Sequence, residues 1–272
     1  MPQRTQTLEA DERSTYLAEE ARRCDPDRYL CALFSPAGRR DTVLGLILFN
    51  HELARIPEIV SQPMAGMIRY QWWRDALDEI SAGKPARQHP IVSELAVGIA
   101  RGWIDAAVLQ QMIDAREPAL AEAAGGDPAE IERFVAATSG SLQDTTYSAL
   151  GGLEPAMAAA ARQIGTAFGL IGIIRAVAHE VLARPPEPTA PSAVTGLIEA
   201  LVARSGELLR TGRKRAGRPA REHMPAFLPA SLTSAYLVRL ARPGIHPQRI
   251  AELARPVSAP ASLLARLLLR RP

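Results

Sequence analysis

Apolar residues recur at helical spacing along most of the chain. Within residues 39–60, one stripe of positions alternates between spacings of four and three, which places them on a single helix face. The stripe consists of Val43, Ile47, Asn50, Ala54 and Glu58. The strand-forming residues Thr, Tyr and Phe are scarce, whereas Ala, Leu and Arg are abundant. The pattern therefore predicts an all-α fold.

Prolines and glycines divide this pattern into a series of expected helices. They cover residues 8–23, 28–34, 39–60, 63–83, 91–103, 105–120, 128–152, 155–183, 192–209, 225–241 and 259–272. Pro57 lies inside the third of these, and proline removes a backbone hydrogen bond, so we expect a kink or an early end near residue 56. The segment RPPEPTAP at 184–191 predicts a linker or a tight crossover.

The expected helix at 155–183 is apolar nearly all round between Met157 and Val177, which predicts a central, buried element. No window reaches the length of a membrane span, because Arg175 interrupts the closest one, GTAFGLIGII. The N-terminus lacks the apolar core of a signal peptide. We expect a cytoplasmic protein that is soluble or peripheral on the inner face of the membrane.

The length of 272 residues and the hydrophobic content of 47% suit one domain, or at most one and a half. We expect an N-terminal helical extension at 1–27, a helical core at 28–183, and basic, divergent helices at 184–272 that complete the same domain. Cys24 and Cys31 suit neither a disulfide framework nor a zinc site.

Positive charge is concentrated in the last quarter of the chain. From residue 203 onward there are fourteen Arg and Lys against three Glu, which leaves +11 there and −8 elsewhere. This excess favours an anionic membrane surface or another acidic partner, although a general compositional bias toward Arg explains it equally well. The basic stretch RTGRKRAGRPAR at 210–221 has no interleaved aromatic residues, so we expect a surface loop and no nucleic-acid binding.

Two matched segments carry the candidate chemistry, FNHELARIPEIV at 49–60 and IGIIRAVAHEVL at 171–182. Residues four apart share a helix face. Two facing helices with paired carboxylates at that spacing could hold Mg²⁺ ions and, through them, a diphosphate. Each segment has only one carboxylate of the two, with Ala54 before Glu58 and Ala176 before Glu180.

Five segments occur in an order that resembles a known family. They are LILFNHELARIPEIVSQP, MIRYQWWRDALDEI, HPIVSEL, FVAATSGSLQD and ARQIGTAFGLIGIIRAVAHE. Together they resemble the squalene/phytoene synthase family of head-to-head prenyl transferases over residues 28–183. Within that family they are most similar to a non-enzymatic branch that includes an assembly factor for mitochondrial respiratory complex I.

The resemblance implies an isoprenoid synthase-type helical bundle around a central cavity, where two Asp-x-x-x-Asp motifs bind Mg²⁺ and prenyl diphosphates. The motif positions fall on Ala54, Glu58, Ala176 and Glu180, and all four depart from Asp. Arg55 stands where the first motif has a second Asp.

The same resemblance gives the candidate cavity and ligand-binding residues. They are Asn50, Arg55, Trp72, Trp73, Ser139, Gly140, Gln143 and Arg175. No catalytic residue and no metal site is expected, with Glu58 and Glu180 as weak metal candidates. For Glu58 the other interpretation is an ordinary salt bridge to a neighbour on its helix, such as Arg55.

Two functions remain open from the sequence. The favoured one is a catalytically inactive binding or assembly factor for respiratory complex I, without a cofactor, whose cavity is free to hold an isoprenoid or quinone-like lipid. The alternative is an active prenyltransferase that uses Mg²⁺ to join two prenyl diphosphates, although prenyl diphosphate ionisation depends on metal ions that the altered motifs hold poorly.

Overall fold

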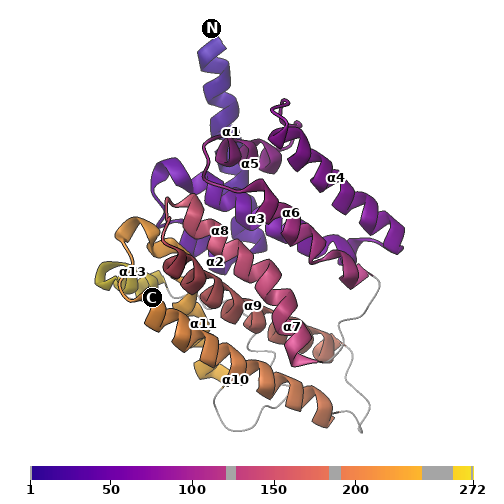
Figure 1. Ribbon diagram of the computed structural model, residues 1–272, viewed down its shortest axis with the longest axis vertical. Coiled ribbons are helices and arrows are strands. Elements are labelled where there is room, and N and C mark those ends of the chain that lie inside the picture. The colour runs from indigo at the N-terminus through magenta and orange to yellow at the C-terminus, as the bar shows by residue number, and fades with distance from the viewer. Residues whose placement is uncertain (1, 121–126, 184–190, 241–259, 271) are drawn as a thin grey trace.

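The computed structural model describes residues 2–120, 127–183, 191–240, 260–270 and 272, and every regular element in these ranges is helical (Figure 1). The helices are α1 (Pro2–Cys24), α2 (Pro26–Ala32), α3 (Ala37–Ile59), α4 (Pro63–Ser81), α5 (Pro90–Ala100), α6 (Ala106–Asp114), α7 (Pro128–Val135), α8 (Ser141–Ala149), α9 (Pro155–Ala183), α10 (Pro191–Ala216), α11 (Pro229–Leu240) and α13 (Pro260–Leu269). The predicted all-α fold is confirmed.

Helix α9 occupies the centre of the bundle, as its apolar sequence predicts. It packs against α10, α8 and α11, and Ile164, Ala167 and Leu170 are completely buried. By length and composition, Pro155–Val177 is apolar enough to cross a membrane, although the sequence suggested no such window. The core helix of a bundle passes the same test, and 56% of the apolar window is buried.

Helix α3 continues through Pro57 to Ile59, close to the expected range of 39–60, so the early end near residue 56 is wrong and the kink stays a prediction. Proline has no N–H to donate to the carbonyl four residues earlier, which is that of Leu53. The buried hydroxyl of Tyr70 on α4 donates to this carbonyl instead, at 3.3 Å. The hydrogen bond that Pro57 cannot make is thus replaced from a neighbouring helix, which lets α3 reach its last turn.

Helices α7 and α8 are continuous through a π-helical turn at Ala136–Gly140. This segment approaches α9 closely, because a Cβ atom on Gly165 would lie 2.6 Å from the Ser139 carbonyl oxygen. A Cβ on Gly140 would lie 2.6 Å from Thr166 Oγ1. Small residues on both helices are therefore what bring the Ser139 side chain against α9.

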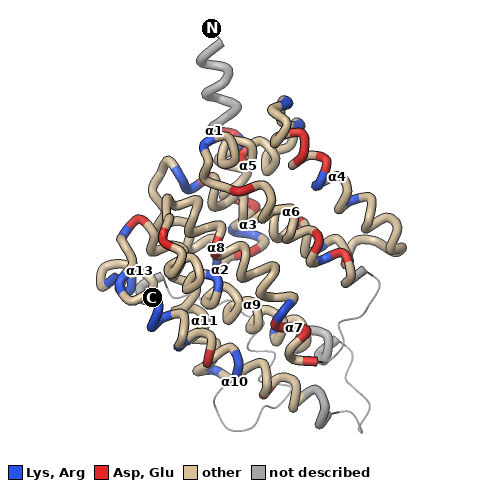
Figure 2. The backbone as a smooth tube through the Cα atoms, in the orientation of Figure 1, with Lys and Arg blue, Asp and Glu red and all other residues tan. Residues whose placement is uncertain are grey.

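The C-terminal helices α10 and α11 pack on α9, and α11 also contacts α2. The basic stretch at 210–221 was expected to be a loop, but α10 continues through it to Ala216. Figure 2 shows Lys and Arg gathered around α13 and the end of α10. The expected linker lies almost entirely outside the described residues, apart from Pro191, which begins α10. The boundaries at residues 27 and 184 stay predictions.

Candidate functional site

A cavity of about 330 Å³ lies between α3 and α9. Its wall includes Ala54 and Glu58 from α3 and Ala176 from α9, so the two matched segments of the sequence do face one space. All three of these side chains are solvent-exposed, which places them at its open side. Glu180 lies within α9, but its side chain is outside the described residues.

Much of the remaining wall is apolar. The apolar side chains are Leu53 and Pro57 of α3, Phe134 and Val135 of α7, and Phe168 and Ile173 of α9. Asn50, Ser139, Thr138 and Tyr70 add polar atoms. Asn50 and Ser139 thus lie where the sequence analysis expected ligand-binding candidates, and their role in binding stays a prediction.

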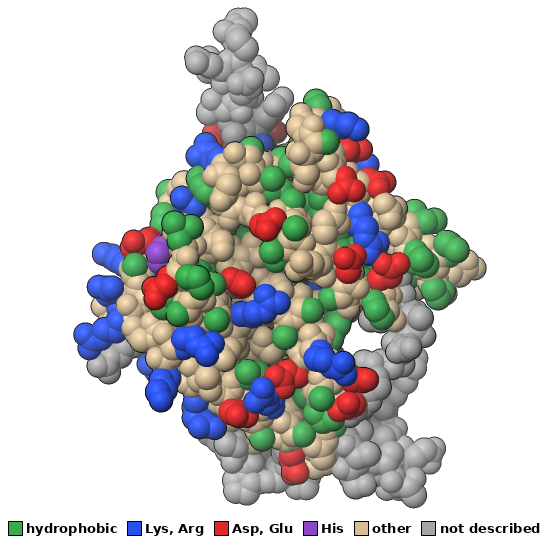
Figure 3. Space-filling model, viewed as in Figure 1, with side chains coloured by type: hydrophobic (Ala, Val, Ile, Leu, Met, Phe, Trp, Pro, Cys, Tyr) green, Lys and Arg blue, Asp and Glu red, His purple; other side chains and the backbone are tan. Residues whose placement is uncertain are grey.

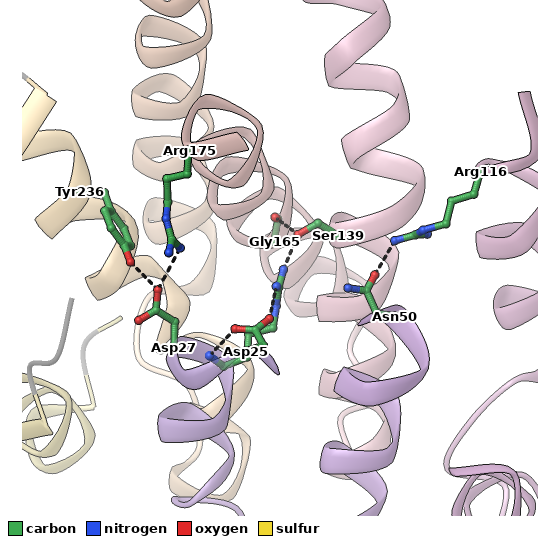
Figure 4. A network of polar contacts seen from close by, with 9 residues as sticks. Asp25, Asp27, Asn50, Arg116, Ser139, Gly165, Arg175 and Tyr236 are labelled. Carbon is green, nitrogen blue, oxygen red and sulfur yellow. Dashed lines mark hydrogen bonds and ion pairs between the residues drawn. The ribbon is translucent and has the colours of Figure 1, made fainter. Parts of the chain in front are cut away.

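Two arginines line this cavity as well, and the first is Arg116, which follows α6. Its side chain is almost completely buried, with 5% exposed. The guanidinium donates to the Met112 carbonyl at 3.1 Å and to Asn50 Oδ1 at 2.7 Å (Figure 4). Burial lowers the pKa of Arg116 to about 10, which leaves it protonated at neutral pH.

The second is Arg28 on α2, whose surroundings differ. Its guanidinium forms an ion pair with Asp25 at 2.8 Å and donates to Ser139 Oγ at 2.6 Å. Ser139 in turn donates to the Gly165 carbonyl at 2.7 Å. The charge of Arg28 is therefore compensated within the protein, and the group joins α2 to the π-helical turn and to α9.

Arg175 was expected among the cavity residues, but it pairs with Asp27 of α2 at 3.5 Å and is absent from the cavity wall. The buried Asp27 also accepts a hydrogen bond from Tyr236 of α11 at 2.5 Å (Figure 4). Burial raises the pKa of Asp27, and the Tyr236 and Arg175 contacts oppose that rise. This cluster ties α2, α9 and α11 together.

Trp72 and Trp73 were expected to wall the central cavity, and the structure corrects this. They line a separate groove of about 350 Å³ with Ile68 and His89. Tyr70 of α4 lines the central cavity, whereas the buried Trp73 packs edge-on against Phe49 of α3, with the ring centroids 5.3 Å apart. Trp72, two positions after Tyr70, points to another face of α4. Exposed hydrophobic side chains gather over the beginning of α4 (Figure 3).

Three further candidates also lie off the cavity wall. Arg55 forms an ion pair with Glu52 at 3.1 Å, so its neighbour is Glu52 and not Glu58. Gln143 donates to the Ala226 carbonyl at 2.7 Å. Gly140 serves the close contact with α9 described above. Gln143 and Gly140 thus serve packing inside the bundle, whereas Arg55 belongs to a partly exposed ion pair, and none of the three is on the cavity wall.

The sequence analysis missed Arg28, Asp27 and Arg116. A signal for Arg116 was present, because Leu109, Met112, Ile113 and Arg116 follow the spacing of one helix face, and the first three are completely buried. An arginine at the next position of an apolar stripe is expected to be buried too. Asp27 and Arg28 had no comparable signal, since their partners come from distant segments.

The squalene/phytoene synthase family profile matches residues 21–185. The chain belongs to the squalene/phytoene synthase family. That match covers more than half of the sequence and includes both segments that face the cavity.

Relatives with assigned names point to one branch of this family. The chain is 34% identical over 164 residues to NADH dehydrogenase (ubiquinone) complex I, assembly factor 6 from Bos taurus. It is 32% identical over the same length to the protein of that name from Homo sapiens. Each match covers 60% of this chain and 49% of the relative, so the chain spans about half the length of the relatives it matches.

Solved structures confirm the expected isoprenoid synthase-type fold. A dehydrosqualene synthase in complex with ligand superimposes with a TM-score of 0.71 over 96% of this chain and 99% of that chain, at 16% identity. Squalene synthase HpnC from Alicyclobacillus acidocaldarius gives a TM-score of 0.70 over 86% of this chain and 95% of that chain, at 15% identity. At such identities the likeness concerns the fold alone.

The residues around the cavity do not fit a magnesium cluster. Hard divalent cations need several oxygen ligands, usually carboxylates. Glu58 is the carboxylate on the described wall, and alanine occupies the first position of both motifs, as Ala54 on α3 and Ala176 on α9. No group of three or more potential ligand side chains occurs among the described residues. The described residues of the wall therefore do not supply the set of oxygen ligands that a magnesium cluster needs.

Proposed function

We propose that this protein is a catalytically silent member of the family that acts by binding, as an assembly factor for respiratory complex I. Two observations together carry the proposal. Alanine occupies the first position of both motifs, and the relatives are named as complex I assembly factors. The names of the relatives support the assembly role, and the alanines on the cavity wall support the proposed absence of the family's chemistry.

Loss of prenyl transfer follows from electrostatics. Ionising an allylic diphosphate leaves a highly charged group, which metal ions normally neutralise. Here Ala54 and Ala176 offer no ligand atoms, and the cavity wall carries two arginines. Arg28 is paired with Asp25, but the charge of Arg116 has only neutral partners among the described residues and disfavours cations in this space.

We place the protein at the inner face of a respiratory membrane. The excess of Arg and Lys from residue 203 onward supports attraction to anionic lipids. The apolar wall formed by Leu53, Phe168 and Ile173 supports a lipid-like ligand such as an isoprenoid or quinone tail. The partner is a complex I subunit or an assembly intermediate.

Deletion of the gene tests the assembly role. We expect membranes of the deletion strain to lose NADH:quinone activity and assembled complex I, while succinate:quinone activity is retained as a control. Complementation with the wild-type gene restores both. Normal complex I in the deletion strain would sink the proposal.

The alternative, an active prenyltransferase, is supported by the family match and by the retained cavity. Purified protein incubated with farnesyl or geranylgeranyl diphosphate and Mg²⁺ tests it. We expect no product above a heat-killed control. Turnover that depends on Mg²⁺ would establish the alternative instead.

A further inference from the structure

We propose that the central cavity binds a monoanionic amphiphile without a metal ion, with the ligand's carboxylate held by Arg116 and its hydrocarbon chain against the apolar wall. The inference rests on the proposed function in one respect, namely that the cavity binds its ligand and does not convert it. It goes further by naming the chemical class of that ligand and the residue that selects it.

The first argument is the uncompensated charge of Arg116. Its described hydrogen-bond partners are the Met112 carbonyl and the Asn50 side-chain amide, and both are neutral. Its Nε atom is buried and has no hydrogen-bond partner among the described residues. A buried charge without a counter-ion is costly, and a bound anion would relieve that cost.

The nearby carboxylates do not act as counter-ions for Arg116. Asp114 and Glu117 flank Arg116 in the sequence, but both bond to Arg74 of α4, at 2.7 Å and 2.5 Å. Glu58 lies on the cavity wall but is exposed to solvent. The fold thus directs the adjacent acids outward to α4 and leaves the Arg116 guanidinium to the cavity.

The second argument concerns the size of the ligand's charge. One uncompensated guanidinium matches one negative charge, and its planar group binds a carboxylate through two parallel N–H donors. A diphosphate carries more charge than Arg116 can neutralise, and the wall offers no set of carboxylates for Mg²⁺. A carboxylate head is therefore the better match.

The third argument is the shape and lining of the space around Arg116. The cavity of about 330 Å³ falls at the lower end of the range of roughly 300–1,000 Å³ that small-molecule sites occupy. Leu53, Phe134, Phe168 and Ile173 provide the apolar surface for a hydrocarbon chain. A small inorganic anion would leave this surface unused, so the lining favours an amphiphile.

Calorimetric titration of the purified full-length protein with octanoate and octan-1-ol tests the proposal, because the two probes share a chain length and differ in the head group. We expect octanoate to bind about tenfold tighter or more, with no change when EDTA is added. In Arg116→Met this preference falls to within about twofold. The matched control is Arg213→Met, because Arg213 is a half-buried arginine that, like Arg116, bonds to a carbonyl but lies on α10, off the wall of the central cavity.

A second variant keeps the arginine in place. Asn50→Asp puts a carboxylate oxygen where the amide oxygen now lies, 2.7 Å from Arg116. We expect this internal counter-ion to weaken octanoate binding about tenfold, to leave octan-1-ol unaffected, and to raise the melting temperature. Asn50→Asp therefore tests whether the charge of Arg116 selects the carboxylate even if Arg116→Met fails to fold.

Several results would overturn the proposal. They are equal binding of acid and alcohol, absence of saturable octanoate binding, unchanged affinity in both variants, or tighter binding of farnesyl diphosphate than of octanoate in EDTA. Failure of the assembly role is a separate result. A deletion strain with normal complex I would refute that role and leave the binding measurements standing, whereas absent octanoate binding would leave the assembly role intact.

Discussion

Arg28 and Arg116 line the same cavity, yet the protein treats their charges differently. Arg28 has Asp25 one helical turn away at 2.8 Å, and the neighbouring Asp27 joins Arg175 to Tyr236. Arg116 bonds only to neutral oxygens among the described residues. Figure 4 shows Arg116 with Asn50 on one side and the contacts of Asp25, Asp27, Ser139, Arg175 and Tyr236 on the other, with no drawn contact between the two sides. The comparison suggests that the compensated side holds helices together, whereas the uncompensated side is available to a ligand.

The largest effect is expected on the compensated side. Asp27→Ala leaves Arg175 and the Tyr236 hydroxyl without this buried acceptor. We expect the free energy of unfolding to fall by about 2 kcal/mol, less than for a fully buried ion pair because the Arg175 side chain is 26% exposed. Urea unfolding measures it. A loss no larger than that of an exposed control, Asp11→Ala, would contradict a structural role for this cluster.

Tyr236→Phe isolates one bond of the same cluster. The substitution removes only the hydroxyl that donates to Asp27 at 2.5 Å and keeps the buried ring. We expect a loss of about 1.5 kcal/mol, the low end for hydrogen bonds to charged groups. Tyr16→Phe, at an exposed tyrosine, serves as the control. Equal small effects in both variants would show that the Tyr236 hydroxyl contributes little.

Placing carboxylates at the open side of the cavity tests whether their absence is what prevents Mg²⁺ binding. In the double variant Ala54→Asp/Ala176→Asp, we expect millimolar Mg²⁺ to stabilise the fold by about 1 kcal/mol. Wild type and the matched double variant with Asn at both positions should not respond. Thermal unfolding with and without Mg²⁺ gives the answer, and a response of the wild type would show that its own residues already hold the ion.

Arg116→Met should change stability least among these variants. The substitution removes two hydrogen bonds to neutral groups but also relieves a buried charge without a counter-ion. We expect these effects to offset each other to within about 0.5 kcal/mol. Urea unfolding of Arg116→Met and of Asp27→Ala under the same conditions compares the two losses of unfolding free energy directly. A loss as large as that of Asp27→Ala would mean that Arg116 is structural and would remove the contrast.

The pH dependence of stability should carry a small contribution from Asp27. Burial raises its pKa in the folded protein above the ordinary 3.8, so the folded state binds a proton more readily than the unfolded state. Stability from this group is therefore gained as pH falls through the raised value toward 3.8. Relative to Asp27→Asn, wild type should gain stability as pH is lowered from 7 to 4. A difference that moves the other way would indicate that the ion pair outweighs burial.

Local sequence was enough to predict most helices. The break at Gly83 and the long run of α9 follow from residues within one or two turns. The predictions from sequence that proved wrong depend on contacts with residues from distant segments. Helix α3 passes Pro57 because Tyr70 bonds to the Leu53 carbonyl, and Trp72 lies in another groove because Tyr70 takes the face of α4 toward the central cavity. Such contacts are set by how helices rotate against each other, which periodicity along one helix does not specify.

For the candidate site, the sequence by itself determined that Ala54 and Ala176 stand on matched helix faces and that neither can bind a metal. Only the tertiary structure decided which charges meet there. Asp114 and Glu117 are Arg116's neighbours in the chain, yet both bond to Arg74 on another helix. The identity of a side chain is fixed by the sequence, but its partner depends on distances across the packed bundle, and ionic interactions act over those distances.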